Sequence, residues 1–97
     1  MSDDMGKIIT DNVWASLKNK VKGKVFVRIY EPNPPKNVRK PYLVVKVCKG
    51  KNVYVQEFDD VYNMFYTTNI TTDDVVDLFM AGYKKKLYKN TDRLFLR

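Results

Sequence analysis

The chain has 97 residues, of which 18 are Lys or Arg, 11 are Asp or Glu and none is His, so its formal net charge is +7. This length predicts one domain with a single core, and an apolar fraction of 44% is typical of a folded domain rather than of a disordered basic tail. The absence of histidine removes the commonest acid–base catalyst at neutral pH, and the single cysteine, Cys48, has no second thiol with which to form a disulfide or a metal site.

The beginning of the chain predicts a flexible segment followed by a helix. Residues 1–9 carry no regular pattern, and we expect them to be flexible. From Thr10 or Asp11 to Val21 the apolar residues fall on one helical face, with Asp11 in the position of an N-cap and Gly23 beyond the end. The residues of this face are Val13, Trp14, Leu17 and Val21.

The segment from Lys24 to Tyr30 predicts a strand, because its apolar residues recur with a period of two. One set of side chains should face the helices and the other set should remain uncovered. The inward residues are Val25, Val27 and Ile29, and the outward residues are Lys24, Phe26, Arg28 and Tyr30.

A basic segment follows, from Pro32 to Asn52, and it contains no acidic residue. Like charges repel one another unless a polyanion neutralises them, so the first hypothesis is a nucleic-acid partner, and a solvated surface loop is the alternative. Within this segment the run Tyr42–Cys48 is rich in β-branched residues, and it either joins the main sheet as an extra strand or forms an arm inside a long loop. The cations of the segment are Lys36, Arg39, Lys40, Lys46, Lys49 and Lys51.

The second half of the chain predicts two strands and a closing helix. Val53–Phe58 and Val61–Thr68 are strand-like runs joined by a tight Asp59-Asp60 connection. Thr71 and Asp74 resemble a capping box that opens the helix. The apolar stripe of that helix is Val75, Val76, Phe79, Met80, Tyr83 and Leu87.

These elements predict an α+β fold of the order α-β-β-β-α, with two helices packed on one face of a small antiparallel sheet and a possible extra strand at 42–48. After the flexible residues 1–9, residues 10–97 should form a single RNA-binding domain that carries the basic loop 32–52. The first fifteen residues lack the apolar core of a signal peptide, and no run of eighteen apolar residues exists, so we expect a cytoplasmic protein without a membrane partner.

Catalytic chemistry is not expected. Cys48 lies in an apolar run, where a buried structural thiol is expected rather than a nucleophile. The pairs Asp59-Asp60 and Asp73-Asp74 occupy a turn and a helix N-terminus, two places that favour Asp for local backbone reasons. We therefore expect no enzyme activity, no catalytic residue, no metal site and no cofactor.

The uncovered face of the sheet is the candidate binding surface. Besides the outward residues of the first strand, the same alternation places Tyr54 and Gln56 on this face, with Lys46 if its run joins the sheet. Interleaved aromatic rings and cations can hold RNA by stacking and phosphate contacts, and they are also enriched in protein interfaces. The pattern favours the two interpretations equally.

Several segments resemble the small Alu-domain subunits of the signal recognition particle. The closing helix of the fourteen-kilodalton subunit has the spacing of Phe79, Ala81, Tyr83 and Leu87 here, preceded by Tyr66-Thr67-Thr68-Asn69. Gly23–Tyr30 looks like its first strand, and a long basic loop follows that strand in both. The nine-kilodalton partner subunit is the second match, through Val53–Asp60 and Phe65–Thr68, which look like its hairpin.

The resemblance implies a subunit that pairs with a homologous small subunit, or with itself as a homodimer, and binds structured RNA, the particle RNA, to support translation arrest during protein targeting. The expected partner interface comprises Phe26, Tyr30, Tyr54 and Tyr66. The RNA contacts implied by the resemblance, together with the open-face cations, are Lys24, Arg28, Lys36, Arg39, Lys40, Lys46, Lys49 and Lys51.

Two other classes of function fit the size and composition. A small viral or phage protein that inhibits a host protein by direct binding is the alternative hypothesis. A DNA-binding regulator ranks third, because the chain lacks a helix-turn-helix pattern and its second helix starts with acidic residues.

Overall fold

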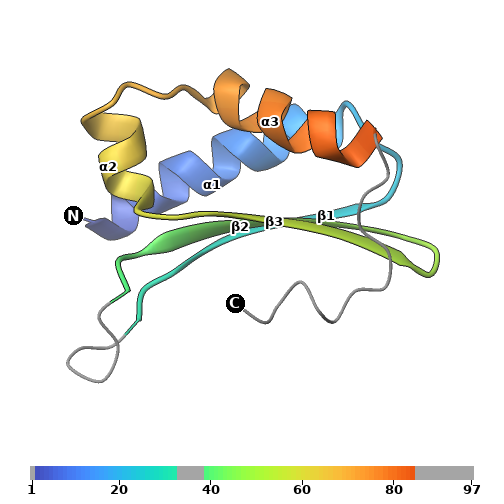
Figure 1. Cartoon of the computed structure of the whole chain (residues 1–97), viewed down its shortest axis with the longest axis horizontal. Helices are drawn as coiled ribbons and strands as arrows, with labels where there is room; N and C mark the ends of the chain where they lie inside the picture. Colours follow the sequence, from blue (N-terminus) through green and yellow to red (C-terminus); the bar gives the residue numbers. More distant parts are fainter. Residues whose placement is uncertain (1, 33–38, 85–97) are drawn as a thin grey trace.

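The computed structural model describes residues 2–32 and 39–84, which form a two-layer α+β structure (Figure 1). This confirms the predicted fold class. In chain order the elements are α1 (Ser2–Lys18), β1 (Lys24–Tyr30), β2 (Tyr42–Lys49), β3 (Asn52–Phe58), α2 (Val61–Tyr66) and α3 (Thr72–Lys84).

The sheet is antiparallel, and its strands lie in the order β1-β2-β3. The run 42–48 therefore joins the main sheet, as the first of the two alternatives predicted, and it is the central strand rather than an arm within a loop. In Figure 1 the helices of the described residues lie together on one side of this sheet. The inward side chains of β2 are fully buried beneath them, namely Leu43, Val45 and Val47.

The prediction of a strand at Val61–Thr68 is wrong, because Val61–Tyr66 forms helix α2 and a turn follows it. Asp60 adopts a left-handed conformation (φ 52°, ψ 53°), which ends the extended chain of β3. The N–H of Val61 then donates to the carbonyl oxygen of Pro41 at 3.0 Å, and Val61 is fully buried. The apolar residues Val61, Met64 and Phe65 recur at three- and four-residue spacing, which suits this short helix.

Helix α1 begins at Ser2 rather than at Thr10 or Asp11. Residues 2–9 are thus helical where we expected a flexible segment, and Ile9 extends the buried stripe of Val13 and Leu17 by one turn. The carboxylate of Asp11 does not cap the helix but accepts a hydrogen bond from Lys7 one turn earlier, at 3.1 Å. The helix ends at Lys18, so Val21 lies beyond it, where it packs against the edge of the core.

The start of α3 has the predicted capping box. The backbone N–H of Thr71 donates to Asp74 Oδ2 at 3.0 Å, and the N–H of Asp74 donates to Thr71 Oγ1 at 3.1 Å. The predicted stripe is also confirmed at Val75, Val76 and Phe79, each at most 1% exposed. Leu87 lies outside the described residues.

The hydrophobic core lies between the helices and the sheet. Helix α1 packs against both β1 and α3. None of the helices in the described residues combines the length and hydropathy needed to cross a membrane. The buried core residues are Ile9, Val13, Leu17, Leu43, Val45, Val47, Tyr54, Phe58, Val61, Val75, Val76 and Phe79.

Replacing Phe79 by Ala should lower the free energy of unfolding by about 3–5 kcal/mol, because the ring is buried in the core. The neighbouring Leu78 is 54% exposed, so Leu78→Ala is the matched control and should change stability by less than about 0.5 kcal/mol. Urea denaturation followed by circular dichroism measures both. Equal losses in the two variants would contradict the orientation of α3.

Candidate nucleic-acid interface

The face of the sheet opposite the helices carries a hollow built mainly by β1 and β2. Side chains alternate along a strand. Because Leu43, Val45 and Val47 of β2 are buried on one face, Tyr42, Val44 and Lys46 lie on the other. The pairing register sets Phe26 opposite Lys46 and Tyr30 opposite Tyr42. The hollow has a volume of about 410 Å³. We call it the open-face hollow, and its lining residues are Phe26, Arg28, Tyr30, Tyr42, Val44, Lys46 and Glu57.

Aromatic rings and cations contact one another within this hollow. Lys46 Nζ lies 5.0 Å from the ring centroid of Phe26, and Arg28 Cζ lies 5.5 Å from that of Tyr30. The rings of Tyr30 and Tyr42 stack with their centroids 5.4 Å apart and 16° between their planes. Phe26 and Tyr30 are nevertheless each 42% exposed. The hollow therefore presents apolar ring surface next to positive charge.

Arg39 bridges one end of the hollow. Its Nη2 donates to Glu57 Oε1 at 2.7 Å and to Asp59 Oδ1 at 2.6 Å, and its Cζ lies 3.4 Å from the ring centroid of Tyr42. The hydrogen bond to Glu57, with a smaller one to Asp59, raises the pKa of the guanidinium above its usual value despite partial burial. This predicted RNA contact thus has its charge balanced by carboxylates of its own chain.

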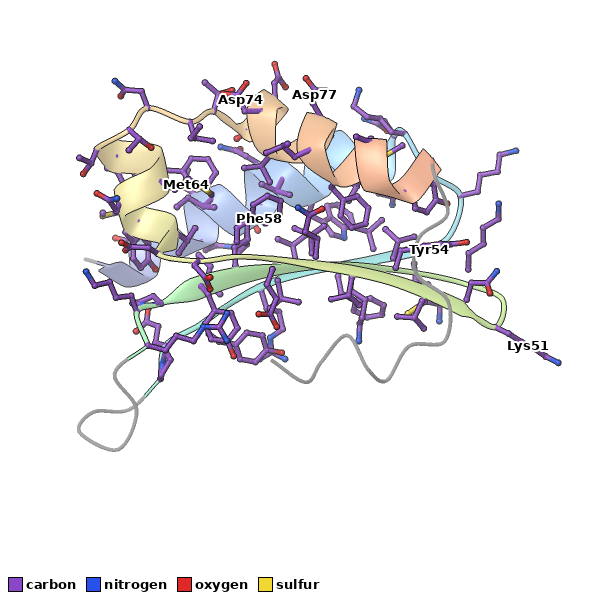
Figure 2. All side chains as sticks on the ribbon, in the orientation of Figure 1. Lys51, Tyr54, Phe58, Met64, Asp74 and Asp77 are labelled. Atoms are coloured by element: carbon purple, nitrogen blue, oxygen red, sulfur yellow. The ribbon has the colours of Figure 1, made fainter. Side chains whose placement is uncertain are left out.

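The other predicted RNA contacts are dispersed. Lys24 is exposed at the start of β1, on the same face as Phe26. Lys40 is 71% exposed and lies 3.9 Å from Asp60. Lys49 and Lys51 are exposed at the β2–β3 turn, where Lys51 points away from the sheet (Figure 2). Lys36 lies outside the described residues. Of the eight predicted cations, the structure brings Arg28 and Lys46 together in the hollow.

The predicted placement of Tyr54 and Gln56 on the open face is wrong. Tyr54 pairs with Val47 and Gln56 pairs with Val45, so both share the face that the helices cover (Figure 2). Tyr54 is only 8% exposed, and its ring meets that of Tyr83 edge to face at 4.7 Å and 73°. Burial, with a smaller contribution from Tyr54, raises the pKa of the Tyr83 hydroxyl above its usual value. Tyr54 is therefore a core residue and not an interface residue.

The remaining predicted interface residues do not form one surface. Tyr66 is 51% exposed, but it ends helix α2 on the helical side of the sheet. Phe26 and Tyr30 are the two that share the open face. The sequence reasoning also missed Tyr42, Val44 and Glu57. The outward position expected for Lys46 could have identified Tyr42 and Val44, because residues two and four places before it in a strand face the same way.

The described residues offer little for metal chemistry. Cys48 is half-buried and makes no disulfide. No group of three or more His, Cys, Asp or Glu within residues 2–32 and 39–84 is arranged to hold a metal ion.

Comparisons with known proteins found no matching family model, no similar curated protein and no similar solved structure. The resemblance to the signal recognition particle subunits therefore stays a prediction. Two of the segments on which it was based, Tyr66–Asn69 and Phe65–Thr68, lie at the end of α2 and in the following turn rather than on a strand.

Replacing Arg39 by Lys should lower the free energy of unfolding by about 1 kcal/mol, because Lys keeps the charge but cannot hold two carboxylates and cover the Tyr42 ring with one planar group. Lys40→Ala removes an exposed cation from the same segment and should leave stability unchanged. Urea denaturation at low and high salt measures the two effects. An unaltered midpoint for Arg39→Lys would contradict a structural role for this contact.

Proposed function

We propose that the protein binds RNA through the open-face hollow. The observation that carries this proposal is the pairing of exposed rings with cations on the sheet face opposite the described helices, above all Phe26 with Lys46 and Tyr30 with Arg28. Bases stack on aromatic side chains with little regard to sequence, while cations nearby neutralise the phosphates. The hollow offers both kinds of contact within one site.

The charges around the hollow support the same proposal. Arg39 offsets the carboxylate of Glu57, which is the acidic residue among those that line the hollow. Arg28 and Lys46 contact rings, and within the described residues neither lies in salt-bridge distance of a carboxylate. Their charge is therefore available to phosphate oxygens.

Binding through this face needs no catalysis. The rings would supply stacking area, and Arg28 would supply a planar group able to contact a phosphate through two N–H donors. Phosphate contacts fix affinity and register without reading sequence, whereas contacts to the 2′-hydroxyl separate RNA from DNA.

The narrower role that we propose is that of an RNA-binding subunit of a cytoplasmic ribonucleoprotein, of the kind implied by the signal recognition particle resemblance. The order α1-β1-β2-β3-α2-α3 supports it, and so does the position of the described helices on one side of the sheet (Figure 1). A sheet of this size has two edge strands, β1 and β3, and such edges invite pairing with a second chain. A homologous subunit or a second copy is the expected partner.

Arg28→Ala and Lys46→Ala should each weaken RNA binding about tenfold, because each removes a charge that faces the hollow. Each should also lower the slope of log affinity against log salt by about one for each phosphate that the variant no longer neutralises. Lys20→Ala makes the same charge change outside the hollow and is the control. Fluorescence anisotropy with a labelled RNA measures all three. Unchanged affinity and slope in both hollow variants would refute the proposal.

Light scattering should give a mass of two chains, or of a complex with a homologous subunit after co-purification, and the paired form should bind RNA more tightly than the single chain. The reason is that pairing makes two basic faces contiguous. A monomer that binds an unrelated protein and no RNA would instead support the inhibitor alternative.

A further inference from the structure

A second hollow lies at the edge of β1 and adjoins the first. It has a volume of about 310 Å³. Trp14 and Lys18 of α1 contribute one wall, and the beginning of β1 contributes the other. Phe26 lines both hollows, so the two lie next to each other at this residue. We call the second one the edge hollow, and its lining residues are Trp14, Lys18, Gly23, Lys24, Val25 and Phe26.

The indole of Trp14 is held at this edge rather than packed into the core. Its Nε1 donates to the carbonyl oxygen of Val25 at 3.1 Å, which satisfies the one donor of the ring. Lys18 Nζ lies 4.8 Å from the ring centroid, and 40% of the residue stays exposed. Trp14 therefore repeats the combination found in the open-face hollow, an oriented, exposed ring beside a cation.

Resting on the proposed RNA-binding function, we propose that Trp14, Lys18 and Lys24 form a second RNA subsite, and that the ligand is a single strand running from the open-face hollow over Phe26 and around the β1 edge. The stacking surfaces belong to different layers of the fold, because Trp14 lies on α1 whereas Phe26 and Tyr30 face away from the helices. Along β1 alone, Phe26 and Tyr30 are separated by about 14 Å, four residues at roughly 3.4 Å each.

This arrangement selects a single strand over a duplex. Bases within a duplex are paired and stacked on each other, so they cannot spread onto rings that lie on two sides of a strand edge. An unpaired strand can bend around the edge and place separate bases on separate rings. The cations Lys18 and Lys24 beside the edge hollow complement the phosphates of such a strand.

The test uses the intrinsic fluorescence of Trp14, because it is the single tryptophan of the chain. The full chain is titrated with an oligouridine of about 12 nucleotides and with an RNA duplex of the same length. We expect the single strand to change the Trp14 emission and to bind at least several-fold more tightly than the duplex.

Variants are compared by anisotropy of a labelled oligouridine. Trp14→Ala should lose about 5- to 150-fold in affinity, the range for removal of one stacked base. Trp14→Phe keeps a ring and should recover most of that loss, and Lys18→Ala should weaken binding without removing the ring. Ile8→Ala, which removes an exposed apolar side chain elsewhere on α1, is the control and should bind normally. If Trp14→Ala does not fold, the Phe and Lys18 variants still decide the matter.

Three outcomes separate the two proposals. Altered emission with the expected ranking of variants supports the edge subsite. The edge subsite is overturned if RNA binding depends on Arg28 and Lys46 but the Trp14 emission and the Trp14→Ala affinity do not change. It is also overturned if the duplex binds more tightly than the single strand. In both cases the proposed function still stands. Failure to bind either RNA overturns both.

Discussion

The structure depends on the register of the central strand β2. Its inward residues Leu43, Val45 and Val47 are fully buried, so they fix which face of the strand meets the helices. Because side chains alternate, a slip of one residue would bury Lys46 and expose all three. The register of β2 therefore determines both which residues form the core and which residues line the open-face hollow. Burying the aliphatic residues is also what places Tyr42 and Lys46 on the candidate site.

The corner at the end of β3 shows that the basic segment 32–52 is not one uniform patch. Here the Arg39 guanidinium joins Glu57 and Asp59, while the Val61 N–H meets the Pro41 carbonyl oxygen. These contacts tie the beginning of β2 to the end of β3, so Arg39 contributes to the architecture. Lys46 lies in the hollow, and Lys49 and Lys51 lie at the far turn. One stretch of like charge is thus divided among structural contacts, the candidate binding face and exposed positions.

Sequence periodicity predicted the elements whose pattern is long and unambiguous. The spacing of Val75, Val76 and Phe79 identified the buried stripe of α3, and Thr71 with Asp74 identified its start, because both features are local. The alternation of β1 correctly placed Phe26, Arg28 and Tyr30 outward for the same reason. These three residues, together with Lys46 on the central strand, are the part of the candidate site that the sequence predicted.

The errors have two physical causes. Short runs such as Val61–Tyr66 suit either a helix or a strand, and the predicted turn at Asp59-Asp60 can lead into either one. The phase of a strand is the other cause. Tyr54 faces inward because of its pairing with Val47, and this register is a property of the β2–β3 hairpin rather than of the alternation within β3. The helical residues before Thr10 were missed although Ile9 continues the four-residue spacing of Val13 and Leu17.

The ring–cation contacts explain how a small protein can keep aromatic rings exposed on its surface. The ammonium group of Lys46 lies over the Phe26 ring and that of Lys18 lies over the Trp14 ring, so each ring has a cation beside it. Each such contact is worth about 0.5–1 kcal/mol at an exposed site, whereas stacking one base is worth about 1–3 kcal/mol. On the proposed function, an arriving strand can displace a cation from its ring, and the displaced ammonium then lies beside a phosphate. The same side chains would protect the rings in the free protein and neutralise the backbone in the complex.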